Sequence, residues 1–426
     1  MKTNLIYILG MMCLSGTVSA QTTVNYTEFE QKVLDYSQTL KQSVSQRTAM
    51  QKAMKAAKTA FFPAVDATGS YQYRINKYDM DFGGMAVPME HDSYSAEVGV
   101  VQPIYAGGSI YHTYKASQIQ SQIADKSVDL TTDNLIYAAE ASYWGTAAQK
   151  EMYKTMCQYV EIISQLTKVL QDKYDDGYIS KTDLIQMQTR LKEAELQRSS
   201  SYQSYQIALQ NMNVLMGLEP DKEVGLVDSI FVELPLPAYV GADAALNVRP
   251  DYAISQLDVD YQKRQVKLAA AKYNPSLSIG FKETWGTQML NISGETMFNS
   301  NVYASVKLPL FHWGARFKST AAQKAILLGK QYALQDKQDQ ITKEVAKAWT
   351  SLTENTRQID IAKVAEENLD LNTFSYTEGR LTILDVLSAQ LTWVQAYTNL
   401  IQSYYEQKIA LADYRKATGI RYLGQK

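Results

Sequence analysis

The sequence predicts a mixed fold in which each chain combines four membrane-type β-strands with long helical hairpins, arranged as two internal repeats. Three observations support this prediction. Landmark prolines and glycines recur at a nearly constant offset, four short segments alternate between apolar and polar residues, and two stretches of more than a hundred residues contain no proline. Alternation with a period of two is typical of half-exposed strands, whereas proline-free stretches rich in good helix formers are typical of helices.

The repeat is visible in landmark residues of the two halves. Pro103 and Pro309 are 206 residues apart, and Gly177 and Gly379 are 202 residues apart. Self-similarity at a fixed offset indicates a duplicated structural unit, and an offset this long means that each unit holds several elements. The predicted first repeat, connector and second repeat are residues 21–216, 217–248 and 249–426.

The first twenty residues have the features of a secretory signal peptide, which we predict for residues 1–20. Lys2 precedes a largely apolar stretch, and Ala20 ends a small-residue cleavage site. Cys13 lacks the small-residue context of a lipoprotein cleavage site, so we expect no lipid anchor. Cleavage leaves Cys157 as the one cysteine, which excludes an intrachain disulfide.

The amino-acid composition indicates which kinds of partner, such as nucleic acid or membrane, the chain is expected to contact. The 42 basic and 44 acidic residues nearly balance, so the chain has no general field for nucleic acid. The 30 tyrosines suit boundaries where one side of the ring is apolar and the other polar, as at a membrane surface. No segment holds eighteen continuous apolar residues, so a transmembrane helix is not expected.

Four segments alternate between apolar and polar residues. In the first, Val65, Tyr71 and Tyr73 fall on one face, and Asp66 and Gln72 fall on the other. A tilted strand needs roughly nine to eleven residues to cross a bilayer, and these segments match that length. Soluble hairpins with one face on a core are the alternative explanation. The predicted strands are 64–76, 93–105, 276–285 and 301–310.

Each second strand is followed by a glycine-containing turn and then by a long helix. The helices predicted here, 109–174 and 315–376, are each followed by a glycine, Gly177 or Gly379, that is able to close a helix in the left-handed conformation. A serine or threonine with an aspartate three residues later then forms a capping-box pattern for a second helix. Each repeat therefore contains a helical hairpin, with tips near 175–182 and 377–384.

Prolines mark the segment between the repeats. Pro220, Pro235 and Pro237 make regular helix improbable, so residues 217–248 read as a connector packed on the outside of the helices. A helix is predicted to start at Arg249-Pro250-Asp251, because proline is favoured in the first turn.

Four strands cannot close a membrane barrel, since the smallest barrels have eight. Open edges in lipid would leave unpaired backbone groups at a cost of several kcal/mol each. The chain is therefore expected to contribute its strands to a shared barrel. Two copies would give about eight strands with a filled lumen, and three would give about twelve with room for a passage.

With two strand pairs, each followed by a long helical hairpin, the sequence resembles the TolC-like outer membrane efflux proteins over essentially the whole mature chain. The matching motifs are Gln102-Pro103-Ile104-Tyr105 with Gly107-Gly108, Leu308-Pro309-Leu310 with Gly314, and the tip sequence from Gly379-Arg380-Leu381-Thr382 to Gln390. The resemblance implies a homotrimer with a twelve-stranded barrel in the outer membrane of a Gram-negative bacterium and an α-helical tunnel in the periplasm. It implies a passive exit duct of a tripartite efflux or type I secretion system, in which a periplasmic adaptor links the tips to an inner-membrane pump.

The family's gate residues carry over unevenly. A tyrosine three residues before the tip glycine helps to hold the entrance shut in the family, and Tyr376 stands at that position. The family's gate arginine lies two residues after that glycine, where this chain has Leu381, whereas Arg380 stands one place earlier. The resemblance further places Asp385 at the constriction and Asp183 at the closed entrance.

A simpler role exists for both aspartates, because an acid near a helix N-terminus stabilises the helix by roughly 0.3–1 kcal/mol. Ser388 stands where the family has a second acidic position, so a second carboxylate ring is missing. For adaptor docking the sequence favours the two tips, where turn chemistry alone is the competing explanation: Gly177, Ile179, Ser180, Gly379, Leu381 and Thr382.

Two other classes of function compete with a channel. An enzyme is disfavoured because the three histidines, His91, His112 and His312, form no metal or catalytic motif, and no phosphate-binding glycine loop is present. No cofactor or metal is expected. A periplasmic coiled-coil scaffold or adaptor would explain the hairpins but not four strands of membrane-spanning length. The sequence does not identify the exported cargo or the partner pump.

Overall fold

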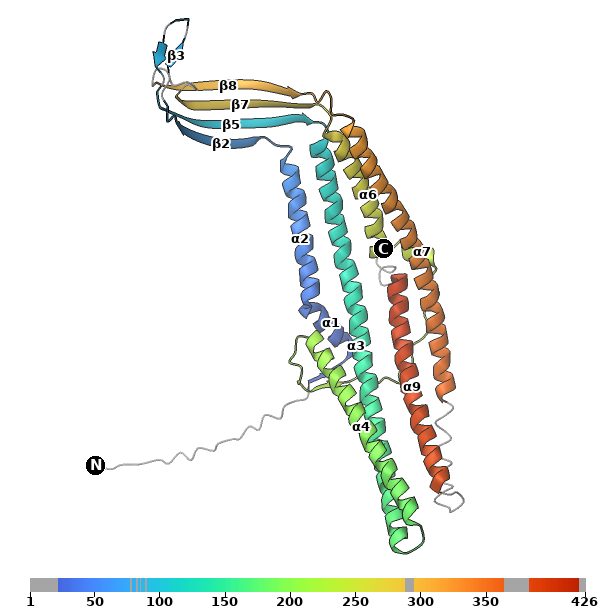
Figure 1. Ribbon diagram of the computed structural model, residues 1–426. Coiled ribbons are helices and arrows are strands. Elements are labelled where there is room, and N and C mark those ends of the chain that lie inside the picture. Colours follow the sequence, from blue (N-terminus) through green and yellow to red (C-terminus); the bar gives the residue numbers. More distant parts are fainter. Residues whose placement is uncertain are drawn as a thin grey trace, which may run out of the picture. The chain divides into compact units, whose positions relative to one another are not determined.

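The computed structural model describes residues 22–76, 79–81, 83–84, 86–88, 90–287, 295–363 and 383–420 (Figure 1). The predicted signal peptide lies outside these residues. The strands are β1 (Thr22–Val24), β2 (Ala64–Tyr73), β3 (Asp79–Asp81), β4 (Ala86–Pro88), β5 (Asp92–Ala106), β6 (Val224–Leu226), β7 (Ser276–Thr287) and β8 (Thr296–Lys307). The helices are α1 (Tyr26–Tyr36), α2 (Gln38–Thr59), α3 (Ser109–Asp175), α4 (Lys181–Leu215), α5 (Ala242–Leu246), α6 (Pro250–Ala271), α7 (Ala315–Lys363) and α9 (Ile383–Thr418).

The chain divides into two compact units that cut across the sequence repeats. We call them the helical unit and the sheet unit. The helical unit comprises Met1–Ser37, Ile136–Leu236 and Leu352–Ala412. The sheet unit comprises Gln38–Leu135, Pro237–Ser351 and Asp413–Lys426. Each unit combines segments of both predicted repeats, because the long helices α3, α7 and α9 contribute residues to both.

The sheet unit contains a four-stranded antiparallel sheet in the order β2-β5-β7-β8 (Figure 1). The ladder between β5 and β7 joins the strand pair of the first repeat to that of the second. Helices α2, α3, α6 and α7 all connect to the sheet at the same end (Figure 1). The register shifts between Pro103 and Tyr105, where proline lacks the N–H that a regular ladder would need.

The fourth strand differs most from its predicted bounds. It spans Thr296–Lys307 rather than 301–310, because residues from 296 onward continue the ladder with the end of β7 at Thr287. At its other end the strand stops before Pro309, which is unable to donate a ladder hydrogen bond. The first strand ends at Tyr73 rather than at residue 76, and β5 and β7 are slightly longer than predicted.

A glycine turn fixes the start of α3 against the end of α6. Gly107 has φ +65°, and a Cβ there would lie 2.5 Å from the carbonyl oxygen of Ala271. The side-chain amide of Asn274 donates a hydrogen bond to the Gly107 carbonyl at 2.9 Å. The position therefore requires glycine both for its backbone conformation and for the close approach of α6.

In the helical unit, α3 and α4 form the predicted hairpin around a compact apolar cluster. The residues of this cluster are Tyr159, Val160, Ile163, Leu170, Leu184, Met187 and Ala194. They recur at the three- and four-residue spacing that puts side chains on one helix face. The cluster packs the two arms of the hairpin together and thereby holds its tip.

The connector of the helical unit is held by polar side chains of α9. The amide of Gln407 accepts a hydrogen bond from the Leu234 N–H at 3.3 Å and donates one to its carbonyl at 3.2 Å. Lys408 Nζ donates to the carbonyl of Val232 at 2.7 Å and lies 4.2 Å from the centre of the Trp144 ring. Burial lowers the pKa of Lys408 to about 8. These bonds satisfy backbone N–H and C=O groups of Val232 and Leu234, which lie in neither a helix nor a strand.

The connector also contains regular structure that its prolines did not predict. Strand β6 pairs in parallel with β1, and the five-residue helix α5 precedes the predicted helix start at Arg249. Within the sheet unit the hydroxyl of Tyr414 accepts from the Val240 N–H at 2.7 Å and donates to the Ala238 carbonyl at 3.2 Å. The same helix, α9, thus holds connector residues in both units.

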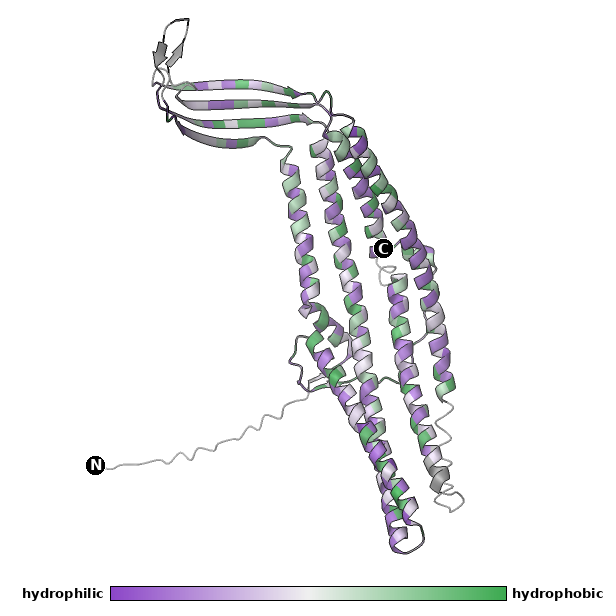
Figure 2. Ribbon diagram, viewed as in Figure 1, coloured by the Kyte–Doolittle hydropathy of each residue, from purple (hydrophilic) through white to green (hydrophobic). Residues whose placement is uncertain are grey.

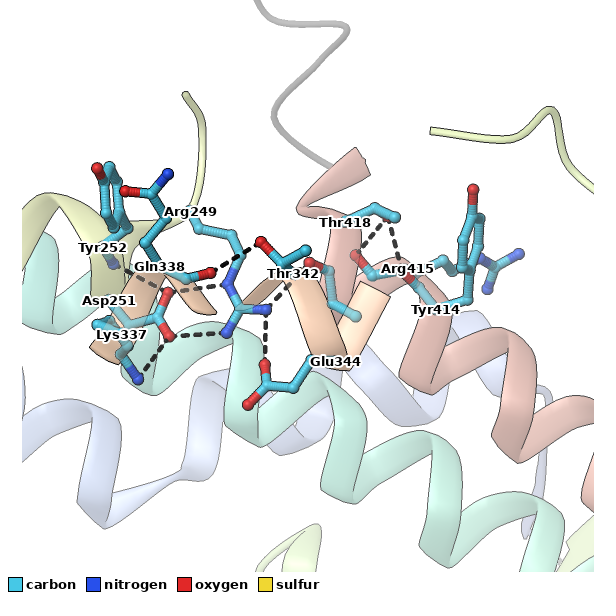
Figure 3. A network of polar contacts seen from close by, with 11 residues as sticks. Arg249, Asp251, Tyr252, Lys337, Gln338, Thr342, Glu344, Tyr414, Arg415 and Thr418 are labelled. Carbon is cyan, nitrogen blue, oxygen red and sulfur yellow. Dashed lines mark hydrogen bonds and ion pairs between the residues drawn. The ribbon is translucent and has the colours of Figure 1, made fainter. Parts of the chain in front are cut away.

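A buried ion-pair network joins three helix segments of the sheet unit (Figure 3). The Arg249 guanidinium donates to both carboxylate oxygens of Asp251, at 2.9 and 2.7 Å, and to Glu344 at 2.8 Å. It also donates to the carbonyl of Ala417, near the C-terminus of α9, at 3.0 Å. Lys337 pairs with Asp251 at 3.1 Å. One side chain therefore links the N-terminus of α6 to α7 and α9.

The network sets the charge state of Asp251. Burial by itself would raise the pKa of this carboxyl, but the hydrogen bonds and charge of Arg249, with Lys337, outweigh burial and lower that pKa. A carboxyl with a lowered folded-state pKa stabilises the fold above its unfolded pKa of about 4, and this stabilisation is lost as the pH falls through the folded pKa.

Arg249→Gln should reduce the free energy of unfolding by about 3 kcal/mol, because it leaves Asp251 buried with an incomplete partner set. The measurement is denaturant unfolding of the detergent-purified protein, followed by circular dichroism. Arg190→Gln is the matched control: its pair with Glu193 is solvent-exposed, so its cost should stay below about 0.5 kcal/mol. The difference between wild type and Arg249→Gln should shrink as the pH is lowered below about 4. Equal losses for the two variants, or a difference independent of pH, would contradict the assigned role.

Candidate functional site

One face of the four-stranded sheet is apolar and exposed. A continuous row across the strands is formed by Val65, Val100, Phe281 and Val302, which the strand register places side by side. Phe298 and Val302 on β8 are 76% and 81% exposed. Colouring by hydropathy shows hydrophobic and hydrophilic residues alternating along the strands (Figure 2). Such a face is unfavourable in water and favourable in lipid.

The opposite face is polar. Thr68, Glu97, Thr284 and Asn299 form one row across it by register. Lys282 forms an ion pair with Glu97 between neighbouring strands, and the hydroxyls of Ser70 and Ser95 lie 2.9 Å apart. Polar side chains on this face, with apolar ones on the other, are the pattern of a membrane strand whose second face meets water.

Aromatic side chains gather at both ends of the sheet. Near the β2–β5 connection lie Tyr71, Tyr73, Tyr94, Trp285 and Phe298, with Tyr94 and Trp285 in ring contact at 5.6 Å. Near the helices lie Phe61, Phe62, Tyr105, Phe311 and Trp313. At about 3.3 Å per residue and a tilt of about 40°, the step from Tyr94 to Tyr105 spans ~28 Å, close to the ~25 Å apolar band of membrane barrels.

Two acidic residues fall on the apolar face by register: Asp92, the first residue of β5, and Glu283 of β7. Glu283 pairs by register with Val98 and Ser300, and the Ser300 hydroxyl donates to its carboxylate at 2.5 Å. The residue stands two positions before Trp285, in the aromatic zone at the end of the strand. A carboxyl is less costly there than at the middle of a bilayer, because depth determines the penalty.

Both edges of the sheet are open. Every residue of β2 and every residue of β8 is exposed, and in the part of the chain that the structure describes no further strand pairs with their outer sides. Together with the apolar face, these edges are the feature that determines what the sheet does. They require a partner strand wherever the sheet is surrounded by lipid.

The tip of the α3–α4 hairpin is a closed, ordered turn. Gly177 has φ +78°, its N–H donates to the Tyr174 carbonyl at 2.9 Å, and the Tyr178 N–H donates to the Lys173 carbonyl at 2.8 Å. These two bonds form a Schellman motif, which the glycine makes possible. Ser180 then caps α4, and its reciprocal bonds with Asp183 confirm the predicted capping box.

The predicted docking residues of this tip differ in exposure. Gly177 and Ser180 are exposed, whereas Ile179 is half-buried against the apolar cluster of the hairpin. Tyr178 is 79% exposed and was missed by the sequence analysis. The residue after a closing glycine frequently packs back onto the preceding helix, so the sequence held no signal for this exposure. Ile179 anchors the turn and Tyr178 projects from it.

Most predicted residues of the second tip are not placed. Tyr376, Gly379, Arg380, Leu381 and Thr382 lie outside the described residues. Asp385 is the third residue of α9, and the structure does not describe its side chain. The assignments of these residues, and of Asp183 as a gate residue, therefore stay predictions.

Two further findings concern metal binding and membrane-spanning helices. Across the described ranges, no group of three or more histidine, cysteine or acidic side chains is arranged to hold a metal ion. In the same residues, none of the helices combines the length and the apolar character that crossing a membrane would require.

The sequence is similar to an outer membrane protein and to a secretion protein over most of its length. It is 21% identical to the outer membrane protein TolC of Vibrio cholerae over 95% of this chain and 92% of that protein. It is also 21% identical to the alkaline protease secretion protein AprF of Pseudomonas aeruginosa, over 78% of this chain and 70% of that protein.

The fold is similar to that of solved outer membrane channels. The CmeC channel of Campylobacter jejuni matches with a TM-score of 0.81 at 17% identity, over 92% of this chain and 85% of that one. CusC matches with a TM-score of 0.79 at 14% identity, over 93% and 92% of the two chains. The family described as "Outer membrane efflux protein" matches two segments of the chain, residues 30–218 and 241–420. The chain belongs to this family and is an outer membrane export channel.

Proposed function

We propose that three copies of the chain pool their sheets in one twelve-stranded barrel and act as the passive exit duct of a tripartite efflux or type I secretion system. The observation that carries this proposal is the open four-stranded sheet with one apolar face. Two copies would give about eight strands and a lumen filled by side chains, whereas three give about twelve and leave a passage. A periplasmic scaffold gives no reason for side chains such as Val302 and Phe298 to face outward.

The helical hairpins are proposed to continue the duct into the periplasm. The strands connect to their helices at one end only, so barrel closure gathers the helices of all copies below one rim. The name of AprF refers to protease secretion, and those of TolC and CmeC refer to outer membrane proteins or channels. These names do not decide whether this chain exports secreted proteins or small effluxed compounds.

The detergent-purified mature protein should have the mass of three chains by light scattering and should open water-filled channels in planar bilayers. The reason is that only added copies supply strands to the open edges of β2 and β8. A water-soluble monomer that needs no detergent would contradict the proposal. So would a trimer that stays non-conducting even after the proposed gate residues Tyr376 and Arg380 are replaced, because that result would favour a scaffold.

The hairpin tips are proposed to dock a periplasmic adaptor, which in turn contacts an inner-membrane pump. The described tip presents Gly177, Tyr178 and Ser180 on a turn whose conformation is fixed by two backbone hydrogen bonds. A pre-formed turn binds without a large ordering cost, and an exposed tyrosine is a frequent anchor of protein interfaces. The second tip, with Gly379, Leu381 and Thr382, is assigned the same role through the repeat.

A photoreactive amino acid in place of Tyr178 should cross-link in cells to a periplasmic protein other than this chain. Tyr202 on α4, which is also exposed but distant from the tip along the helix, serves as the control position and should give no such adduct. Mass spectrometry identifies the partner. Adducts that contain only copies of the channel would place the tip at a contact between protomers and reject docking.

The entrance is proposed to be held closed by residues around the second tip. Tyr376 and Arg380 take part in closing, Asp385 lines the constriction, and Asp183 stands at the first tip. Asp183 also caps α4, so its carboxylate is already engaged by Ser180. A threefold ring of Asp385 carboxylates would favour cations over anions.

Asp385→Asn should reduce the cation preference of the open channel, measured as the reversal potential under a salt gradient in planar bilayers. Asp35→Asn, on the exposed face of α1, removes the same formal charge elsewhere and should leave the reversal potential unchanged. If the two variants and the wild type show the same reversal potential, Asp385 does not line the constriction.

A further inference from the structure

A groove of about 480 Å³ lies between α3 and α6 in the sheet unit, and it is strongly basic. Its charged lining consists of four basic side chains and one acidic one: Lys115, Lys263, Arg264, Lys267 and Asp260. The lining therefore has a formal charge of +3. The remaining lining is the amides of Gln118 and Gln122 with the side chains of Ile119 and Leu257.

Of the four cations, one is neutralised by an ion pair and a second donates to a neutral amide; in the described residues the other two have no such partner. Lys263 is paired with Asp260 at 2.8 Å, and Lys115 donates to the side-chain oxygen of Gln118 at 3.0 Å. Among the residues that the structure describes, no carboxylate pairs with Arg264 or Lys267. A groove with unpaired guanidinium and ammonium groups attracts anions, and phosphate in particular, because arginine is able to bind its oxygens in pairs.

The positive charge of the groove also affects the pKa of nearby His112. Burial lowers the pKa of its imidazole, and the charges of Arg264 and Lys267 lower it further. The Nδ1 atom is buried without a hydrogen-bond partner in the described part of the chain. The histidine follows the Gly107 turn, so the positive field extends to the junction of sheet and helices.

The groove lies at the level where lipid headgroups would meet the protein. Lys267 and Arg264 stand nine and twelve residues before β7, and α6 ends at Ala271. At about 1.5 Å per residue they lie ~6 and ~10 Å below the end of α6. A headgroup layer of roughly 5–8 Å borders the hydrocarbon on each side, and long basic side chains reach toward such a layer.

The face of α3 that lines the groove also carries an aromatic residue of the membrane boundary. Tyr111 precedes Lys115 by four residues, so the two side chains lie on the same face of the helix. Tyr111 is 48% exposed. Tyrosines are enriched at membrane–water interfaces, so Tyr111 favours a position of the groove on the lipid side of the channel wall.

We propose that this groove binds the phosphate of an anionic lipid headgroup in the periplasmic leaflet of the outer membrane. Arg264 and Lys267 neutralise the phosphate, while Lys115 and the glutamine amides of α3 supply further hydrogen-bond donors. The lipid would bridge α3 of the first repeat to α6 of the second at the base of the sheet.

The test is a titration of the detergent-purified, full-length mature protein with phosphatidylglycerol and with phosphatidylcholine, followed by native mass spectrometry. Arg264→Gln with Lys267→Gln should weaken phosphatidylglycerol binding about 25-fold, and Lys267→Gln alone about fivefold, because each basic residue at a membrane surface contributes a similar increment. Phosphatidylcholine binding should not change. Lys267 is exposed, so the single variant remains informative if the double variant fails to fold.

The chain offers a matched control. Lys52 and Lys55 on α2 stand twelve and nine residues before β2, the same two distances that separate Arg264 and Lys267 from β7, but they do not line the groove. Lys52→Gln with Lys55→Gln should change phosphatidylglycerol binding less than twofold. An equal loss in this control would show general attraction of basic residues to anionic lipid and would reject a site.

Two further outcomes would overturn the proposal. If inorganic phosphate displaces phosphatidylglycerol at equal concentration, the groove is a free-anion site rather than a lipid site. If Arg264→Gln with Lys267→Gln shifts the reversal potential of the channel while lipid binding is unchanged, the groove faces the lumen. Neither result would affect the proposed exit-duct function, which is tested separately by trimer mass and conductance.

Discussion

The structure depends on the unpaired backbone groups along the outer sides of β2 and β8. In lipid each unsatisfied N–H or C=O costs several kcal/mol, and these two strands expose ten and twelve residues. A single side-chain hydrogen bond contributes about 0.5–1.5 kcal/mol, which is small against a penalty of that size. The sheet is therefore stable in a membrane only when other copies supply the missing ladders, so assembly of copies is part of folding in the membrane.

Closure of the sheet constrains the helices because strands and helices meet at a small set of fixed junctions. At one junction Gly107 allows the backbone of α6 to approach closely, and Asn274 bonds its carbonyl. Below it, Arg249 links the start of α6 to α7 and to the end of α9. These contacts are polar and directional, so they fix the register of the helices more sharply than an apolar seam of interchangeable side chains would.

Sequence patterns predicted the features that depend on residues close to one another in the chain. Alternation located all four strands, and the Ser180–Asp183 spacing predicted the capping box that the structure shows. The start of β8 was placed five residues too late, because Ser300 interrupts the apolar alternation between Phe298 and Val302, whereas the ladder with β7 continues through it. The Arg249 network was not foreseen: its partners Glu344 and Ala417 are 95 and 168 residues away, and no local pattern encodes such contacts.

Duplication placed basic residues at the same level in both repeats, but packing gave them different surroundings. Lys52 and Lys55 on α2 match Arg264 and Lys267 on α6 in their distance from the following strand. The second pair lines a groove with α3, where Lys115 adds a third cation and two glutamines add amides, and the first pair does not line that groove. A repeated sequence thus fixes how far a charge stands from the membrane, whereas the neighbouring helix decides whether that charge becomes part of a binding site.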